Sequence, residues 1–361
     1  MILYKNGLVL RGSSLVKTDI VANHGKIIEI APRIIADEQT EVIECEGKYV
    51  LPALVDLHTH GALGYDFNTA DADGMKKIIE FYVAHGVGTF LPTLTADSDE
   101  VICRQVKLIC ELAKDYPEVK GINLEGPFIS PEMSGGIDVK FLQKPSADKF
   151  YEYQKAANGF IKMITVAPEL PDAIPFISEI ADGGVVVSIG HSNANGRQVK
   201  QALDAGAKSF THFGNFMSQM GASDLNVTGS AMLYNAFAEV VMDGKSVNKE
   251  VVSLLTKTKG ADKIIGVTNS SKFTGLADGN YRFGNTEVVV AAGDAYYKGT
   301  NLWAGSMLDA YAGLANTVAF CNLPLAQAIA VWTVNPAKLI GMENRIGTIE
   351  IGKDADFIIF G

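Results

Sequence analysis

Five side chains of metal-binding type are spaced along the first two thirds of the sequence: His58, His60, Glu125, His191 and His212. From His60 to Glu125 is 65 residues, and from Glu125 to His191 is 66. Each interval equals about two strand–helix units at roughly 30 residues per unit. The 21 residues from His191 to His212 make one short unit. Imidazoles and a carboxylate at this spacing predict a site for zinc, iron or a similar divalent ion.

The first two histidines, His58 and His60, are expected to end a strand. Side chains at i and i+2 point to the same side of a strand, so both imidazoles can reach one ion. An isolated HxH is a weak signal, but five ligand candidates at successive strand ends are a strong one. The other histidines have structural interpretations, because His24 falls in a β-rich terminal segment and His85 lies just before Gly86 at a helix end.

The middle of the chain alternates apolar β segments with helix-like segments. The strand candidates are Val50–Leu57, Gly88–Leu91, Gly121–Leu124, Lys162–Val166, Val185–Ile189, Ser209–Thr211, Glu239–Met242 and Ile264–Val267. Strands separated by helices indicate parallel βαβ units, and eight of them favour a closed (β/α)8, TIM-like barrel. The active sites of such barrels lie at the C-terminal strand ends. All five ligand candidates fall at those ends.

Local signals mark further elements between and after these strands. A helix over Glu100–Ala113 is entered through Ser98, and a helix over Arg197–Ala205 ends before Gly206. Tyr281–Val290 has the pattern of an additional hairpin after the eighth strand.

Both ends of the chain are rich in short β segments and turn residues. The segments are Ile2–Tyr4, Leu8–Leu10, Thr18–Ala22, Lys26–Ile30 and Glu41–Glu44, then Gly347–Glu350, Gly352–Asp356 and Phe357–Phe360. Because they flank a middle of different character, we expect one small β-sandwich module built from both termini. The predicted organisation is a module of residues 1–49 and 344–361 beside a metal-dependent barrel of residues 50–343.

The bulk composition limits the possible partners. The chain has 361 residues, 47% of them hydrophobic, and a net charge of -10, which argues against a nucleic-acid surface or a basic membrane patch. No signal-peptide pattern opens the chain, and the longest apolar stretch, Ala310–Val334, is interrupted by Asn316, Asn322, Pro324 and Gln327. The four cysteines form no CxxC pair. We expect a soluble, cytoplasmic protein without a nucleic-acid or membrane partner.

Motifs around the ligand candidates resemble those of a known family. They are Leu51–Pro52 with Asp56–Gly61, Leu124–Ile129, Gly190–Ala194, Thr211–His212 with Asn215 and Met217, Ala304–Ser306, Asn335–Ala337 and Gly352–Asp356. Together they resemble the N-acetylglucosamine-6-phosphate deacetylases of the amidohydrolase superfamily. The Glu-Gly-Pro-Phe and Gly-His-Ser-Asn-Ala motifs separate this family from the hydantoinases and dihydroorotases.

The resemblance implies a function and assigns roles. Glu125, His191 and His212 match the family's main metal site, and His58 and His60 match the additional site of some members, with Glu125 bridging two ions. The implied cofactor is one or two divalent ions, zinc or iron. The implied reaction is hydrolysis of the N-acetyl group of an amino-sugar phosphate by a metal-activated water. Family members are typically dimers, so a homodimer is expected.

The sequence departs from the family at the proton carrier. The family places an aspartate, its general base and acid, where this chain has Asn269 within Val267-Thr268-Asn269-Ser270. An amide cannot exchange a proton at neutral pH, and its carbonyl is a weaker metal ligand than a carboxylate. General acid–base catalysis typically contributes about 10²–10⁴-fold to a rate. This change alone could silence the reaction.

The substrate-binding positions are altered as well. Ile137 stands near one family histidine, and Lys245 or Ser246 stands at another, while Asn215 is retained. The family's phosphate-binding arginine is missing from residues 221–228. A charge-assisted hydrogen bond contributes roughly 1.5–3 kcal/mol, so this loss could weaken binding about tenfold. Lys245 or Lys272 could compensate.

The sequence is compatible with three hypotheses. The first is a deacetylase of an amino-sugar phosphate. The second is a divergent amidohydrolase that acts on another acylated amine, with its proton carrier among Lys272, Asp243, Asp278 and Asp294. The third is a catalytically silent metal- or sugar-binding paralogue, motivated by Asn269.

Overall fold

The computed structural model describes residues 1–284 and 286–361, and within them eight parallel strands form one sheet. The strands, in their order around the sheet, are β6 (Leu54–Thr59), β9 (Val87–Thr95), β10 (Ile122–Glu125), β11 (Ile161–Val166), β12 (Val186–Ile189), β13 (Ser209–Phe210), β14 (Phe237–Val241) and β15 (Ile264–Val267). The two outer strands meet where the N–H of Asn269 donates to the carbonyl of His58 over 2.9 Å. The sheet is thus a nearly closed TIM-like barrel, and the predicted fold is confirmed.

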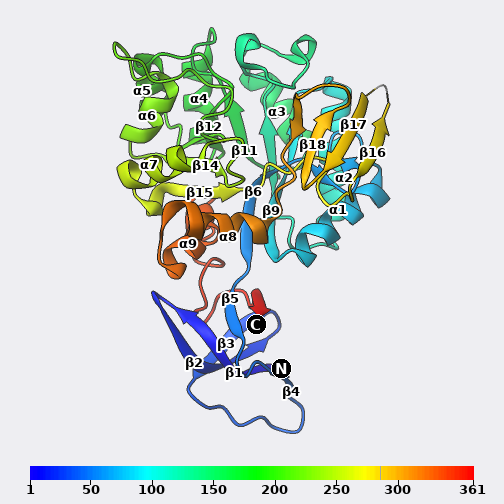
Figure 1. Ribbon diagram of the computed structural model, residues 1–361, viewed down its shortest axis with the longest axis vertical. Helices are drawn as coiled ribbons and strands as arrows, with labels where there is room; N and C mark the ends of the chain where they lie inside the picture. The colour runs from blue at the N-terminus through cyan, green and yellow to red at the C-terminus, as the bar shows by residue number, and fades with distance from the viewer. Residues whose placement is uncertain (285) are drawn as a thin grey trace.

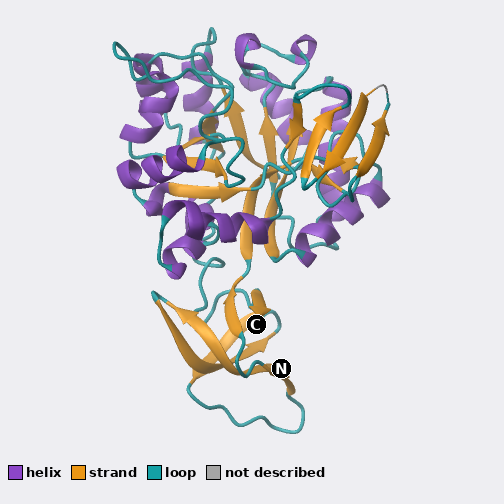
Figure 2. Cartoon of the chain, in the orientation of Figure 1, coloured by secondary structure: helices purple, strands orange, loops and turns teal. Residues whose placement is uncertain are grey.

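Helices cover the outside of this barrel (Figure 2). They are α1 (Ala72–Ala84), α2 (Asp99–Leu112), α3 (Ala147–Ala156), α4 (Ala173–Asp182), α5 (Gly196–Asp204), α6 (Asn226–Leu233), α7 (Lys249–Lys259), α8 (Ala310–Cys321), α9 (Leu325–Val331) and α10 (Val334–Leu339), with short 3-10 turns at Pro131–Met133, Val139–Phe141 and Ala261–Lys263. The predicted start at Ser98 is confirmed, because Ser98 caps α2 through the N–H of Val101. Asn195 and Gln198, which were not predicted, form a capping box on α5. The predicted helices 100–113 and 197–205 each lie within one residue of the observed bounds.

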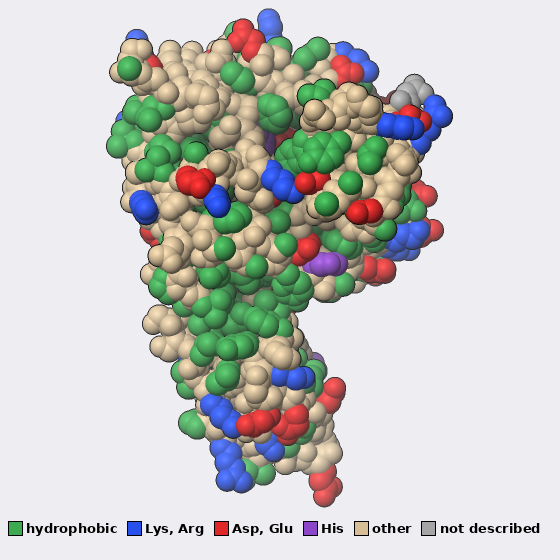
Figure 3. All heavy atoms as spheres, in the orientation of Figure 1, with side chains coloured by type: hydrophobic (Ala, Val, Ile, Leu, Met, Phe, Trp, Pro, Cys, Tyr) green, Lys and Arg blue, Asp and Glu red, His purple; other side chains and the backbone are tan. Residues whose placement is uncertain are grey.

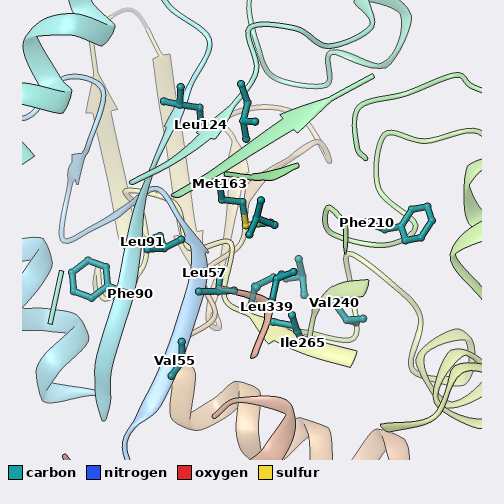
Figure 4. Close-up of a cluster of buried hydrophobic side chains, with 14 of the residues drawn as sticks. Val55, Leu57, Phe90, Leu91, Leu124, Met163, Phe210, Val240, Ile265 and Leu339 are labelled. Atoms are coloured by element: carbon teal, nitrogen blue, oxygen red, sulfur yellow. The ribbon is translucent and has the colours of Figure 1, made fainter. Parts of the chain in front are cut away.

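The main core fills the barrel and the space between strands and helices. Figure 4 draws part of it, with Leu339 of α10 among side chains such as Val55 of β6 and Ile265 of β15. Glycine allows one close approach in this core, because a Cβ on Gly266 would lie 2.2 Å from the ring of the fully buried Trp332. A larger residue at this position would have to displace the indole.

The predicted first strand, Val50–Leu57, is two strands in the structure. β5 (Tyr49–Pro52) pairs with terminal strands, and after Ala53 the chain enters the barrel as β6. The sequence shows one continuous apolar segment because both pieces are buried. Pro52, which has no N–H to give to a ladder, ends the first piece.

Strands from both termini form a second sheet, which lies below the barrel in Figure 1 together with both chain ends. Its members are β1 (Ile2–Arg11), β2 (Ser14–Asn23), β3 (Lys26–Ala31), β4 (Glu41–Glu44), β5 and β20 (Phe357–Phe360). The sandwich-like module expected from the two termini is therefore one six-stranded mixed sheet with a core of its own. The module boundaries at 49/50 and 343/344 stay a prediction.

Some predicted terminal strands were wrong in detail. Ile2–Tyr4 and Leu8–Leu10 are the two halves of β1, which is irregular between Tyr4 and Gly7. Gly347–Glu350 is not a strand, and Gly352–Asp356 contributes only a bridge from Asp354 to Lys26. Gly347 and Gly352 have φ of 92° and 93°, so the chain turns at both glycines where an extended segment was expected.

The additional hairpin is present and belongs to a larger sheet. β16 (Gly279–Phe283) and β17 (Thr286–Ala291) pair antiparallel and continue into β18 (Asp294–Tyr297) and β19 (Trp303–Gly305). Residue 285, within the predicted hairpin, lies outside the described residues. A two-stranded ribbon, β7 (Gly61–Ala62) and β8 (Tyr65–Asp66), follows β6.

Hydrophobic side chains gather at the waist between the barrel and the terminal sheet, on the face that Figure 3 shows. A groove in this region is lined by Leu10 and Pro52 on one side and by Ile329 and Val334 on the other. In the part of the chain that the structure describes, no helix has the length and apolar character needed to cross a bilayer.

Candidate metal centre

The barrel brings all five predicted ligands to the C-terminal ends of its strands. His58 lies within β6 and His60 directly follows it, while Glu125 is the last residue of β10. His191 and His212 come two residues after β12 and β13. The five side chains form two groups that share Glu125.

The first group consists of Glu125, His191 and His212. Glu125 Oε1 lies 2.9 Å from His212 Nε2 and 3.0 Å from His191 Nε2, and the two nitrogens are 3.0 Å apart. His191 Nδ1 lies 2.7 Å from the carbonyl of Met133, so Nδ1 carries the proton and Nε2 presents a lone pair. Lone pairs that converge at these distances repel one another unless a cation lies among them. The donor set therefore fits a divalent metal ion.

The second group consists of His58, His60 and Glu125, with His58 Nε2 lying 3.3 Å from Glu125 Oε1. The two Nε2 atoms are 3.2 Å apart, and His60 Nε2 lies 3.5 Å from Glu125 Oε2. His60 Nδ1 donates to the carbonyl of Thr93 over 3.3 Å, which again leaves Nε2 as the acceptor. Glu125 contacts the histidines of both groups, Oε1 facing His58, His191 and His212 and Oε2 facing His60, so it has the position of a bridging ligand.

The electrostatics of the pair of groups agree with this geometry. Burial raises the pKa of Glu125, but His191, His58 and His60 outweigh it and hold that pKa well below the ordinary value. Burial lowers the pKa of His58, but its carboxylate neighbours raise it to about 10. Burial lowers the pKa of His60 to about 4 and also lowers that of His212. Glu125 is thus held ionised and His60 and His212 are held neutral, the forms in which these groups bind metal, while His58 favours the charged form beside its carboxylate neighbours.

Left-handed backbone occurs at the same strand ends, as it does at several turns elsewhere in the chain. The backbone φ angles of His191, His212 and Asn269 are 46°, 26° and 47°. These values lie in the left-handed region that residues other than glycine rarely adopt. Phe216, also left-handed at 46°, stacks on the ring of His191 with centroids 5.2 Å apart. Each such residue costs on the order of 1 kcal/mol, and strain of this kind clusters at functional sites.

Glu239 is a site residue that sequence reasoning missed. It lies inside β14 and is fully buried, with Oε2 3.1 Å from His58 Nδ1 and accepting from the N–H of His212 over 3.3 Å. Its contact assigns the Nδ1 proton of His58 and leaves Nε2 toward Glu125. The available signal was a carboxylate at the start of the predicted apolar strand Glu239–Met242, since a charged residue in an apolar strand is rarely buried without a partner.

Asp56 is a second buried carboxylate that the sequence analysis did not single out as a site residue. It accepts from the N–H of His58 over 3.2 Å and from Thr268 Oγ1 over 2.5 Å. Burial raises its pKa to about 6. Asp56 therefore links the strand of the histidine pair to the residue before Asn269.

The candidate catalytic and substrate-binding residues Asn269, Asn215, Ile137 and Lys245 lie on different loops. Asn269 is held beside His58 by its backbone, and Asn215 donates its backbone N–H to His212 while its Nδ2 is buried without a partner among the described residues. Ile137 is half-buried in the loop after β10. Lys245 is exposed and forms an ion pair with Asp294 of β18.

The alternative proton carriers already have structural partners. Asp243 accepts from the backbone of Lys245 and Ser246, and Asp278 accepts from the N–H of Ala292. Asp294 pairs with Lys245, and Lys272 pairs with Asp66 over 2.8 Å. None of these contacts joins a carrier to either histidine group within the described residues.

Comparison with known proteins agrees with the site. The amidohydrolase family model matches residues 49–361. The N-acetylglucosamine-6-phosphate deacetylase of Lysinibacillus sphaericus is 30% identical over 345 residues, covering 94% of this chain and 88% of that protein. The enzyme of the same name from Bacillus subtilis is 29% identical, with 99% and 92% covered.

Solved structures with the same name superpose over nearly the whole chain. The Pasteurella multocida protein has a TM-score of 0.91 at 26% identity, with 99% of this chain and 95% of that chain covered. A point mutant from Mycobacterium smegmatis, in complex with N-acetyl-D-glucosamine-6-phosphate, has a TM-score of 0.90 at 27% identity, with 99% and 94% covered. On its sequence, its fold and its histidine and glutamate cluster, the chain belongs to the N-acetylglucosamine-6-phosphate deacetylase family of amidohydrolases.

Proposed function

We propose that the protein is a metal-dependent C–N hydrolase that removes the N-acetyl group of an amino-sugar phosphate. The observation that carries the proposal is the convergence of Glu125 Oε1, His191 Nε2 and His212 Nε2 within 3.0 Å of one another. The likeness to the N-acetylglucosamine-6-phosphate deacetylases supports the substrate class.

In this proposal Glu125, His191 and His212 hold one divalent ion, zinc or iron, and His58 and His60 hold a second where two are bound. The ion supplies a water of lowered pKa and polarises the amide carbonyl. Met133 and Thr93 fix the protonated nitrogens of His191 and His60, so that both rings keep their orientation.

Asn269 has a limited role in this reaction. Its amide can donate and accept hydrogen bonds, and it can orient a water or the acetyl group next to His58. It cannot take up or return a proton, so the leaving amine takes its proton from water. We therefore propose a slow enzyme, reduced by about 10²–10⁴-fold relative to one with a carboxylate at this position.

The assembly and the location are further parts of the proposal. A homodimer is proposed from the family likeness alone. A reducing compartment, the cytoplasm, is proposed because the cysteines of the described chain are free thiols.

The second candidate function is a catalytically silent metal- or sugar-binding protein. Asn269 favours it, together with the structural partners that occupy Asp243, Asp278, Asp294 and Lys272. These partners weaken the idea of a different proton carrier more than they weaken a slow deacetylase.

Acetate release separates the candidates. The protein loaded with zinc or with ferrous iron would be incubated with N-acetylglucosamine-6-phosphate and with its unphosphorylated sugar, and free acetate and amine would be measured. We expect slow release that requires metal and is lost in Glu125→Gln. A fully metal-loaded protein whose acetate release does not exceed that of Glu125→Gln would support the silent protein.

A further inference from the structure

The N-terminal ends of the barrel strands, opposite the candidate metal centre, line a half-open cavity of about 530 Å³. Lys162 of β11, Val186 of β12 and Phe237 of β14 line it, and Lys208 lines it just before β13. Small-molecule sites usually have volumes of about 300–1,000 Å³. Because the metal ligands lie at the other ends of these strands, the cavity is separate from the centre described above.

The wall of this cavity is positively charged, although the whole protein carries a net charge of -10. Its charged lining residues are one carboxylate, Asp204, and the lysines Lys162, Lys200, Lys208, Lys263 and Lys338. Asp204 pairs with Lys200. The other four lysines form no ion pair within the residues that the structure describes. Their ammonium groups repel one another and together attract a ligand that carries several negative charges.

The cavity also has an apolar floor. Leu339 and Ala207 are buried beneath the lysines, and Phe237 presents an aromatic ring whose centroid is 4.7 Å from Lys263 Nζ. An apolar and aromatic floor under a cationic rim fits a planar ring joined to phosphates. A small inorganic anion alone would leave the floor uncovered.

A neighbouring cavity extends the positive surface. It has a volume of about 700 Å³, shares Lys162, Ile340 and Gly341 with the first, and adds Lys120, which has no ion pair among the described residues. Two half-open hollows side by side suit a folded small molecule better than a flat membrane surface.

We propose that the lysine-lined cavity binds a nucleoside polyphosphate, with its phosphates at Lys162, Lys208, Lys263 and Lys338 and its base against Phe237. Four unpaired cations match the three to four negative charges of a di- or triphosphate. A carboxylate or a monophosphate would leave at least two of them unmatched. The proposal is independent of whether the metal centre is catalytically active.

The test is calorimetric titration of the metal-loaded full chain with ADP, inorganic pyrophosphate and adenosine at low ionic strength. The cavity variant is Lys208→Gln with Lys338→Gln, two surface positions whose loss leaves the core intact. The matched control is Lys249→Gln with Lys257→Gln on α7, which changes the net charge equally away from the cavity. A second cavity variant, Lys208→Arg with Lys338→Arg, keeps the charge.

We expect one ADP per chain, with pyrophosphate weaker and adenosine weaker still. The glutamine pair in the cavity should lower ADP affinity by at least about tenfold, whereas the arginine pair, the α7 pair and Glu125→Gln should leave it nearly unchanged. The proposal is overturned if ADP does not bind at about 1 mM, or if the α7 pair weakens binding as much as the cavity pair. Loss of ADP binding in Glu125→Gln would place the nucleotide at the metal centre and also overturn it. Binding of RNA or anionic vesicles to these lysines, without binding of ADP, would also overturn the proposal.

Discussion

The backbone N–H of Asn269 donates to the carbonyl of His58 over 2.9 Å, and this bond joins the last strand end of the barrel to the first. The next residue, Ser270, accepts from the N–H of His60 over 2.9 Å. Main-chain atoms therefore fix Asn269 beside the histidine pair, and the identity of its side chain is not needed for that position. Because aspartate, like asparagine, tolerates the left-handed backbone of this position, Asn269→Asp is expected to change the chemistry of the site without moving it.

Asn269→Asp should raise the deacetylation rate. A carboxylate at this position can accept and return a proton and is a stronger metal ligand than an amide. We expect kcat on N-acetylglucosamine-6-phosphate to rise by about 10²–10⁴-fold, with a bell-shaped pH profile that the parent protein lacks. Steady-state acetate release from the metal-loaded proteins measures both.

Asn269→Ala is the matched control for this change. It removes the amide without adding a proton carrier, so its rate should stay at or below that of the parent. Equal rates for the aspartate and alanine variants would show that another group carries the proton.

Glu125→Gln should remove metal from both groups of ligands at once. Glu125 faces His191 and His212 with one oxygen and His60 with the other, so the amide weakens both sites. Metal content measured by mass spectrometry after dialysis should fall to near zero, while His24→Gln, in the turn between β2 and β3, should retain full content. Retention of one ion per chain in Glu125→Gln would mean that the two groups bind independently of this carboxylate.

The barrel and its ligand set could be predicted from the sequence because both depend on periodic signals. Apolar strands recur with the length of a βα unit, and the ligands follow the strands that carry them. Glu239 could not be placed, since its role depends on β14 lying two strands from β6 around the closed barrel, next to β15. The break between β5 and β6 was hidden because Leu51 and Leu54 are equally buried in two different sheets.

Glu239→Gln should weaken metal binding at the His58 and His60 group. The carboxylate orients His58 by accepting its Nδ1 proton over 3.1 Å, and loss of such a contact typically costs about 10–100-fold in metal affinity. Competition with a chelator, followed by metal analysis, should show one weakened ion in this variant. Glu239→Asp should recover part of the affinity, and the exposed Glu250→Gln should have none of the effect. Equal weakening of both ions would indicate general damage to the barrel.

Asp356 should make the free energy of unfolding decrease as the pH rises from about 4 to about 6. Burial against Gly88 raises the pKa of this carboxyl to about 6, above the ordinary value of about 3.9. The folded state therefore holds the proton over a range where the unfolded state has lost it, and stability declines as pH rises through that range. The full shift in pKa corresponds to about 3 kcal/mol of unfolding free energy, and solvent screening of the partly exposed carboxyl reduces this to about 2 kcal/mol. Asp356→Asn should remove that part of the decline.

Urea unfolding at several pH values tests this sign. Asp354→Asn is the control, because Lys26 and Arg345 outweigh burial and lower the pKa of Asp354. That carboxylate contributes stability above its unfolded pKa and loses it as pH falls, so its variant should be destabilised at neutral pH. A difference between the parent and Asp356→Asn that is the same at pH 4 and pH 7 would refute the assignment to Asp356.

Recognition of a substrate phosphate should be weak in the parent protein and should improve in Asp66→Asn. Lys272 and Lys245, which could replace the missing arginine, are already paired with Asp66 and Asp294. Release of Lys272 makes one charge-assisted hydrogen bond available, so KM for N-acetylglucosamine-6-phosphate should fall by about tenfold. KM for unphosphorylated N-acetylglucosamine should not change, because that sugar has no charge with which the freed lysine can pair. Asp294→Asn releases Lys245 instead, so comparing the two variants shows which lysine reaches the phosphate. If KM for the phosphorylated sugar stays constant in both variants, neither lysine reaches it.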